Sequence, residues 1–408
     1  MKRNNFIHKI ASGVQDLCAV WAQEMRNVLK DEGVIMFCVI VPLLYPLLYS
    51  WIYNNEVVRE VKTAIVDLSH SHSSREFIRE YDASPDAEAS YYCGSIDEAK
   101  KLVEKQAVHG ILYFPADFDT RLHRGEQARV GVYTDMSLML TYKAIYQTAQ
   151  AIASHINAGI QISQSTGFTN RDDEITTKPL DFDEVPIFNT TGGYGNAILP
   201  AVLVLIIQQT LLLGVGMVAG TNREREERLY ADATEHLDGM IRIVLGKAMC
   251  YFMLYAVLGT YLTLVVPHLF GFVSMVSWTT LFGFLLPYTL ACIFFALALS
   301  RMVRYRENVM LLVVFTSVPL LFLTGVSWPQ SNIPAFWQGV SWLFPSTFGV
   351  RAFLRLSSMG ATLADVMTEF RALWIQVGVY FILACFVFRH KDITDQEVSK
   401  EEKLPAEE

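Results

Sequence analysis

Six long apolar runs are the feature that most restricts how this chain folds. They cover roughly residues 33–53, 196–220, 248–270, 279–300, 308–326 and 372–388. A helix needs about 20 apolar residues to cross the hydrocarbon core of a bilayer. Of the 408 residues, 52% are hydrophobic and only 18% are charged, whereas about a quarter are charged in soluble domains. The sequence therefore predicts a polytopic α-helical membrane protein with six transmembrane helices.

The distribution of Lys and Arg predicts which side of the membrane each connection faces. Residues 1–32 hold five, 221–247 hold five and 301–307 hold three, whereas 271–278 hold none and 327–370 hold two. Short cytoplasmic connections are enriched in Lys and Arg. Both termini are therefore predicted to be cytoplasmic and residues 54–195 extracytoplasmic, since long segments translocate regardless of their charge.

The long segment between helices 1 and 2, residues 54–195, is predicted to be an extracytoplasmic α/β domain with a helical stalk. Strand-like runs cover 61–68, 89–93, 108–115 and 128–135, and helical runs cover 73–81, 95–106 and 138–164. Ser73 with Glu76, and Ser95 with Glu98, have the spacing of a capping box. The Ala- and Gln-rich run over 138–164 is the expected stalk.

The rest of the chain divides by composition. Residues 1–32 are expected to form a cytoplasmic amphipathic helix, whose apolar stripe comprises Val14, Leu17, Cys18, Trp21, Met25, Val28 and Leu29. Residues 33–53 are transmembrane helix 1, and 196–388 form a domain of five further transmembrane helices. Inside that domain, prolines interrupt 327–370 and predict a re-entrant or interfacial segment. The charged tail 389–408 is expected to be cytoplasmic and to lack regular structure.

Motifs for chemistry are absent from the sequence. It contains no Walker A pattern, so ATP binding by this chain is not expected, and no catalytic, cofactor-binding or metal site is predicted. His70 and His72 have metal-ligand spacing, but a turn is favoured because no further ligands lie nearby. Gly216 and Gly220 form a GxxxG pair that favours close helix packing. A net charge of −8 argues against a nucleic-acid partner.

Polar residues inside apolar spans are the strongest functional signal from the residues alone. Four are singled out: Asn196, Gln208, Gln209 and Gln376. Polar groups in lipid are costly and usually face the helix bundle or a cavity. They predict a translocation path or a dimer seam. Helix–helix hydrogen bonding alone is the open alternative.

Three segments together resemble the permeases of ABC-2 type transporters, in the subset with a large extracytoplasmic domain between helices 1 and 2. They are WAQEMRNVLKDEGVIMFCVIVPLLYPLLYS (21–50), REREERLYADAT (223–234) and TGVSWPQSNIPAFWQGVSWLFPSTFGVRAFL (324–354). With the six spans and the inserted domain, the resemblance covers essentially the whole chain.

The resemblance implies a transport subunit of the bacterial cytoplasmic membrane, with no enzyme activity of its own. Cytoplasmic ABC ATPase subunits would bind and hydrolyse ATP-Mg, and a second permease copy, identical or homologous, would complete the path. The residues implied to face the ATPase are Glu24, Arg26, Glu224, Arg225, Glu226, Glu227 and Arg228. Without the resemblance, 223–228 is a solvated helix face that also anchors span 2.

The substrate class and the other partners follow from less specific features. Apolar spans without buried charge favour a hydrophobic or amphipathic substrate, such as a drug or lipid. Membrane lipid is an expected partner, and contact with a periplasmic adaptor is left open. The alternative function is a membrane-anchored receptor or interaction protein with an extracytoplasmic binding domain.

Overall fold

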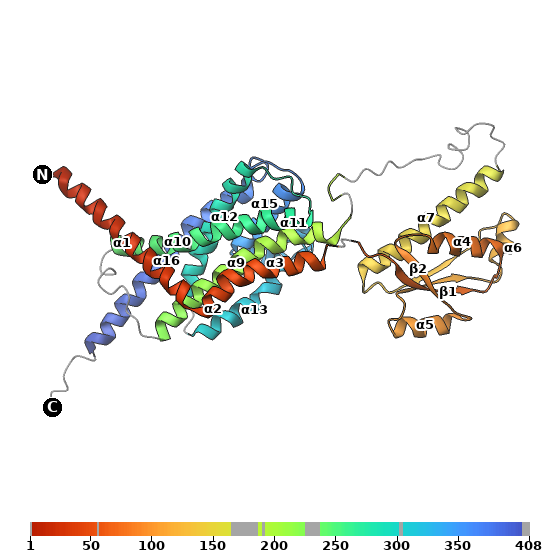
Figure 1. Cartoon of the computed structure of the whole chain (residues 1–408), viewed down its shortest axis with the longest axis horizontal. Helices are drawn as coiled ribbons and strands as arrows, with labels where there is room; N and C mark the ends of the chain where they lie inside the picture. The colour runs from red at the N-terminus through yellow and green to blue at the C-terminus, as the bar shows by residue number, and fades with distance from the viewer. Residues whose placement is uncertain are drawn as a thin grey trace, which may run out of the picture. The chain divides into compact units, whose positions relative to one another are not determined.

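The protein forms two compact units in a computed structural model that describes residues 2–54, 57–164, 187–189, 192–224, 237–301 and 305–401. The helical unit comprises Met1–Asn54 with Phe188–Glu408, and the α/β unit comprises Asn55–Ile187 (Figure 1). The first holds nearly all of the apolar runs, and the second holds the sheet.

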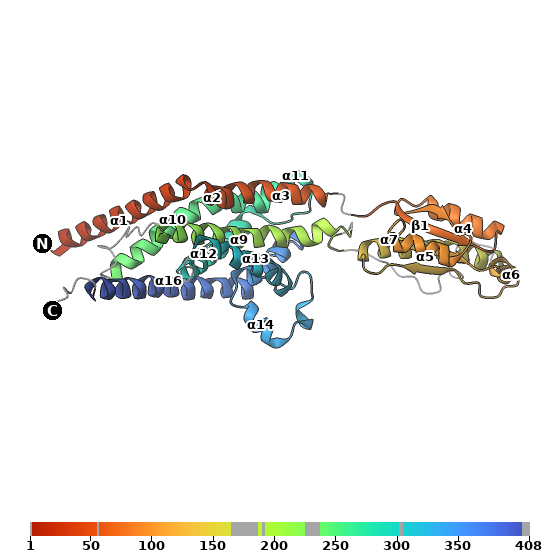
Figure 2. The same ribbon diagram turned by 90° about the horizontal axis from the view of Figure 1, so that it is seen from below.

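Six helical spans in the described part of the chain are long and apolar enough to cross a membrane, as predicted. Figure 2 shows them side by side along the helical unit. The first combines α2 (Glu32–Ile35), the π-helical turn η1 (Met36–Ile40) and α3 (Val41–Ile52). The others are α9 (Tyr194–Glu224), then α10 (Leu237–Thr260) continued by η2 (Tyr261–Val265) and α11 (Val266–Phe270), then α12 (Trp278–Ser300), α13 (Arg306–Leu323) and α16 (Met367–Glu401).

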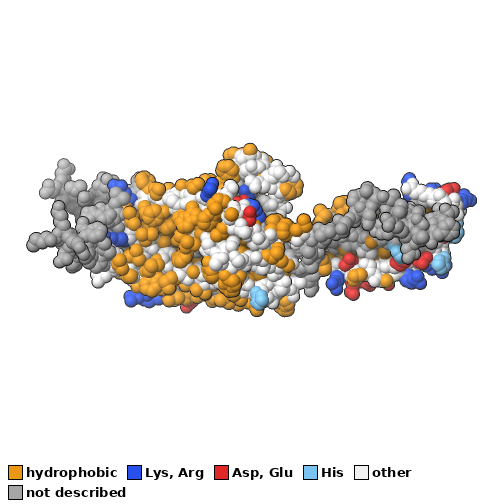
Figure 3. Space-filling model, turned by 90° about the horizontal axis from the view of Figure 1, so that it is seen from above, with side chains coloured by type: hydrophobic (Ala, Val, Ile, Leu, Met, Phe, Trp, Pro, Cys, Tyr) orange, Lys and Arg blue, Asp and Glu red, His pale blue; other side chains and the backbone are white. Residues whose placement is uncertain are grey.

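Helix α9 is the centre of the helical unit. Most of its length is buried against α12, α13 and α15 (Pro345–Ser358), whereas only 17% of the apolar windows of α13 and α16 is buried. Hydrophobic side chains gather over the outer surface of this unit (Figure 3). Such a surface is stable in lipid or against another protein, and unfavourable in water. The chain is therefore a multi-pass membrane protein.

The GxxxG pair of α9 packs against α13. A Cβ atom on Gly216 would lie 2.6 Å from Cγ1 of Val309, and one on Gly220 would lie 2.9 Å from Cα of Arg306. Side chains at these positions would force the two helices apart. The prediction of close helix packing is confirmed, and it fixes the register of α9 on α13.

Prolines break the segment after α13 into short helices, as predicted. The 3-10 turn η3 (Gln330–Asn332) follows Pro329, α14 (Ala335–Ser341) follows Pro334, and α15 begins at Pro345. Proline suits the start of a helix because its missing N–H would have no partner there. Helix α15 is buried between α9 and α12, whereas α14 is largely exposed.

Two predictions about the ends of the helical unit are corrected. Helix α1 (Lys2–Lys30) packs on α10, but Val20, Glu24 and Val28 are its buried residues, while Val14 and Leu29 are exposed. The C-terminal tail is helical to Glu401, as a continuation of α16. Neither Gly nor Pro occurs between Gly378 and Pro405, so nothing in the sequence stops the helix there.

The sheet of the α/β unit has the order β2-β1-β3-β4. Its strands are β1 (Val61–Asp67), β2 (Ala87–Tyr92), β3 (Gly110–Phe114) and β4 (Gly131–Thr134). β2 and β3 pair parallel to β1, and β4 pairs antiparallel to β3. This arrangement brings the amino ends of β1 and β3 together with the carboxyl end of β4.

Helices cover both faces of the sheet. Helices α4 (His72–Asp82), α6 (Phe118–His123) and α7 (Met139–Gln164) pack on one face, and α5 (Ile96–Glu104) packs on the other. Helix α7 is not a free stalk, because Ile145, Ala149 and Ile152 are buried on it. Ser95 caps α5 as expected, whereas the N-cap of α4 is Ser71 and not Ser73.

Candidate functional site

A cluster of polar residues joins the ends of three spans in the helical unit. Asp31, Thr221, Glu224 and Arg306 form it, and it is called the Asp31–Arg306 cluster below. The guanidinium of Arg306 donates to both carboxylate oxygens of Asp31, at 2.7 and 3.0 Å. The hydroxyl of Thr221 donates to the same carboxylate at 3.1 Å, and Glu224 accepts from the backbone N–H of Arg306 at 3.1 Å.

Local structure holds Asp31 in place for this interaction. Its side chain is the N-cap of α2 and accepts from the backbone N–H groups of Gly33 and Val34. A Cβ atom on Gly33 would overlap the guanidinium of Arg306, so glycine lets the arginine approach. Burial raises the pKa of Asp31, but the bonds from Arg306 and the N-cap outweigh it and hold the pKa below its usual value. The carboxylate stays ionised down to a pH below that value.

A second polar cluster fixes α1 on α10. The carboxylate of Glu24 is 1% exposed, accepts from Nζ of Lys247 at 2.6 Å and accepts from the hydroxyl of Tyr251 at 2.9 Å. Glycine at 246 allows the close approach, since a Cβ atom there would lie 2.8 Å from the side chain of Val20. Buried ion pairs of this kind are costly to break at one partner.

The predicted ATPase-facing residues separate in the structure. Glu24 is not accessible to a partner protein, because its carboxylate is enclosed between α1 and α10. Arg26 and Glu224 are exposed, and Glu224 belongs to the Asp31–Arg306 cluster. Arg225, Glu226, Glu227 and Arg228 lie outside the described residues. The chain leaves α9 for this segment directly beside the Asp31–Arg306 cluster.

Three of the four polar residues singled out within the spans are hydrogen-bonded to backbone groups of neighbouring segments. Gln208 accepts from the N–H of Ser346 at 2.6 Å, and Asn196 accepts from the N–H of Val273 at 2.9 Å. Gln376 donates to the carbonyl of Trp342 at 2.8 Å. Only the bond of Gln208 joins two helices, α9 and α15, because Val273 and Trp342 lie outside helices.

Gln209 differs from the other three. Its side chain is 8% exposed, and within the described residues neither its amide oxygen nor its nitrogen has a hydrogen-bond partner. It lies two turns before Gly216, on the side of α9 that faces α13. The pairings of Gly220 with Arg306 and Gly216 with Val309 place it level with Thr316, whose hydroxyl donates to its own helix.

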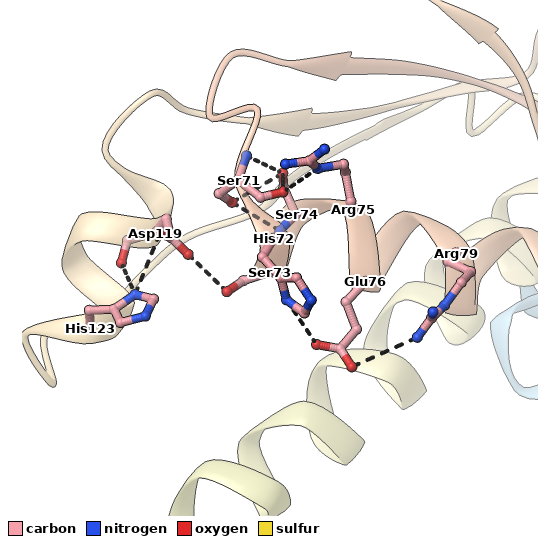
Figure 4. A network of polar contacts seen from close by, with 9 residues as sticks. All are labelled: Ser71, His72, Ser73, Ser74, Arg75, Glu76, Arg79, Asp119 and His123. Atoms are coloured by element: carbon pink, nitrogen blue, oxygen red, sulfur yellow. Dashed lines mark hydrogen bonds and ion pairs between the residues drawn. The ribbon is translucent and has the colours of Figure 1, made fainter.

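His70 lies in the connection between β1 and α4, and His72 is the first residue of α4. The described residues contain no cluster of three His, Cys, Asp or Glu side chains placed for a metal ion. His70 has a positive φ of 48°, and His72 lies 4.0 Å from Glu76 on α4. Figure 4 shows this network, in which Ser73 donates to Asp119 of α6 at 2.8 Å.

Sequence reasoning missed Asp31, Lys247 and Arg306 as partners. Each is a charged residue beside an apolar run, which is the ordinary signature of a membrane boundary. The sequence carries no signal that pairs Asp31 with a residue 275 positions away.

Six helices long and apolar enough to cross a membrane, packed around an apolar core with a few buried polar side chains, define a polytopic membrane protein. Residues 33–386 match the family described as ABC-2 family transporter protein. The match covers well over half of the chain, so the protein belongs to this family. No curated protein matches the chain.

We expect Glu24→Leu to destabilise the protein, because it leaves the ammonium of Lys247 buried without its carboxylate. Loss of one partner of a buried pair costs about 3–5 kcal/mol. The double variant Glu24→Leu/Lys247→Leu removes both charges and should recover most of that loss. Thermal unfolding of the purified protein in detergent measures both effects.

The control for this prediction is Arg26→Ala on the exposed side of α1, which should unfold as the wild type does. A Glu24→Leu protein as stable as the wild type would show that Glu24 is not a structural residue.

Proposed function

We propose that the chain is the membrane-spanning permease subunit of an exporter in a bacterial cytoplasmic membrane. Separate cytoplasmic ABC ATPase subunits hydrolyse ATP-Mg and supply the energy. Membership of the ABC-2 family implies association with such ATPases, and the sequence has no Walker A motif of its own. The substrate is hydrophobic or amphipathic, in the class of drugs or lipids.

The unpaired amide of Gln209 carries this proposal. A buried amide without a hydrogen bond costs about 1–3 kcal/mol in proteins, and water is scarce at mid-span. A polar group of a passing substrate is the partner that would satisfy it. Because the residues one turn away from Gln209 on α9 are apolar (Leu205, Ile206, Leu212 and Leu213), the bound molecule must be mostly apolar with a polar group, which is an amphipathic molecule.

The exposed face of α13 supports assembly with a second permease copy. Leu311, Val314, Phe315 and Val318 are exposed on it, and the opposite side of α13 packs on α9 beside Gln209. Two copies that meet near this helix would each contribute one Gln209 to a shared path. The second copy is identical to this chain or a homologue of it.

The Asp31–Arg306 cluster supports a route for coupling. It ties the ends of the first, second and fifth spans together next to the segment Arg225–Arg228. An ATPase that moves this segment, and also contacts the exposed Arg26 of α1, would shift all three span ends as one body. Substrate moves only if the two conformations bind it differently, and Gln209 lies between two of these three spans.

The proposed orientation places both termini and the 221–247 connection in the cytoplasm, and the α/β unit outside. The charge distribution of the connections supports it. The Asp31–Arg306 cluster and the buried pair of Glu24 with Lys247 would then both lie at the cytoplasmic ends of the spans.

We expect an ABC ATPase to co-purify with the tagged protein from its native membrane. ATPase activity should rise when the purified permease is added back to its partner in proteoliposomes. If no ATPase accompanies the protein and candidate ATPases do not respond to it, the exporter proposal is wrong.

Reversal of the charges at Glu224–Arg228 should uncouple ATP hydrolysis from transport without preventing membrane insertion. The reason is that this segment would be the surface that the motor pushes. Transport and ATPase rates measured in the same proteoliposomes test it, with the exposed Arg389 of α16 reversed as a control for charge alone. Normal transport by the Glu224–Arg228 variant would show that this segment does not couple ATP hydrolysis to transport.

Gln209→Leu should reduce export of amphipathic dyes while leaving the melting temperature unchanged or higher, because it removes an unsatisfied amide. Gln208→Leu is the matched control: it breaks the bond to Ser346 and should lower the melting temperature, in line with about 1 kcal/mol for a typical hydrogen bond. Wild-type export by Gln209→Leu would exclude Gln209 from the path.

One observation favours the alternative of a receptor or interaction protein. The α/β unit has a cleft of about 540 Å³ at the carboxyl ends of β1 and β2, lined among others by Asp67, Arg75, Arg79 and Tyr92. Ligands of open α/β sheets bind outside these strand ends. Ligand binding by the full chain without any ATPase partner would support this alternative over export.

A further inference from the structure

The α/β unit exposes an apolar loop that the proposed function does not use. Met136, Leu138 and Met139 are 62%, 49% and 66% exposed, and together they are called the Met136–Met139 loop. Single exposed apolar residues are common on protein surfaces. Three long apolar side chains within four residues form a concentrated patch, and such patches mark contacts with proteins or membranes.

This loop is held in a fixed conformation. Asp135 accepts from the backbone N–H and the hydroxyl of Ser137, at 2.9 and 2.8 Å. The N–H of Asp135 donates to the carbonyl of His109, which ties the loop to the start of β3. Behind it, Thr141 donates to the carbonyl of Leu138, and Ile145 is fully buried. The apolar side chains are therefore displayed by a structured turn.

The loop lies at the end of the α/β unit that receives the chain from the membrane. Thr63, near the start of β1, pairs with Gly110, and Gly110 pairs with Thr134 at the end of β4. The loop continues from Thr134 beyond the amino end of β1. Val61 follows Ile52, the last residue of the first span, by nine residue steps. Nine steps reach at most about 30 Å, so a short tether joins the first span to this end of the unit.

We propose that the Met136–Met139 loop inserts into the surface of the lipid bilayer and anchors the α/β unit there. The partner is the lipid itself, because the short tether limits how far this end of the unit can lie from the end of the first span. Val58, on the tether, is also partly exposed and would add to the contact. Tyr133, exposed on β4, is of the residue type that favours the membrane interface.

The chemistry of the loop indicates which lipids it binds. The loop contains no Lys or Arg, and the nearest basic residue, Lys143, lies one turn into α7. Asp135, which precedes the loop, is hydrogen-bonded to Ser137. Insertion therefore depends on apolar burial and not on attraction to anionic lipid. The inference holds for either orientation of the protein and does not depend on transport.

The test is photo-crosslinking of the full chain in nanodiscs of phosphatidylethanolamine and phosphatidylglycerol. A p-benzoylphenylalanine residue replaces Met136 or Met139, and mass spectrometry identifies the adducts. The matched control is the same replacement at Leu68, an exposed apolar residue just after the carboxyl end of β1. We expect lipid adducts at 136 and 139 that are several-fold more abundant than at 68.

A second variant tests whether the apolar side chains cause the contact. With the photo-reactive residue at Lys143, one turn into α7, the triple change M136S/L138S/M139S should abolish most lipid adducts. The changed residues are exposed, so the fold should remain, which circular dichroism checks. Equal lipid adducts at 68 and 139, adducts at 139 with protein only, or no loss in the triple variant would each overturn the proposal. No ATPase or substrate is needed.

Discussion

In the hydrocarbon core of a bilayer, a backbone N–H or C=O group has no water to bond, so each interruption of a helix must be satisfied by the protein itself. The arrangement of the helical unit follows from this constraint. The proline-broken segment after α13 frees backbone groups beside α9. Gln208 accepts a hydrogen bond from the first free N–H of α15. Gln376 donates to the carbonyl of Trp342, and Arg351 donates to the carbonyl of Thr324. Each bond joins this segment to a different helix.

Charged side chains at the ends of the spans are likewise paired within the protein. The guanidinium of Arg306 and the carboxylate of Asp31 satisfy each other, and Asp31 also caps α2. Glu24 and Lys247 do the same between α1 and α10. Both pairs join elements far apart in sequence, so the span ends behave as linked bodies and not as independent helices. A motor acting on one of them would act on several.

Gln209 is the exception to this pattern. The free energy lost by burying its unpaired amide suggests a functional role for this side chain. The other three polar residues singled out in the spans each make a hydrogen bond within the protein, although Nε2 of Gln208 and Oε1 of Gln376 have no partner among the described residues. In Gln209, which is buried between α9 and α13, neither amide atom is paired there. The α/β unit shows the reverse exception: its Met136–Met139 loop exposes apolar side chains where a soluble domain would place polar ones.

The sequence alone determined the six spans, the inserted α/β domain and the breaks at Pro329, Pro334 and Pro345, because hydropathy, strand periodicity and proline act locally. It also identified GxxxG packing, since small residues permit close approach wherever a partner helix lies. Only the tertiary structure decided which partners these features have. From the sequence, Glu24 is interpreted as a surface charge, and only the structure places Lys247 beside it. Gln208 and Gln209 are neighbours in sequence with different partners. Gln208 accepts a hydrogen bond from the N–H of Ser346, whereas Gln209 is unpaired. The two side chains meet different neighbours because successive residues of a helix are rotated by about 100°.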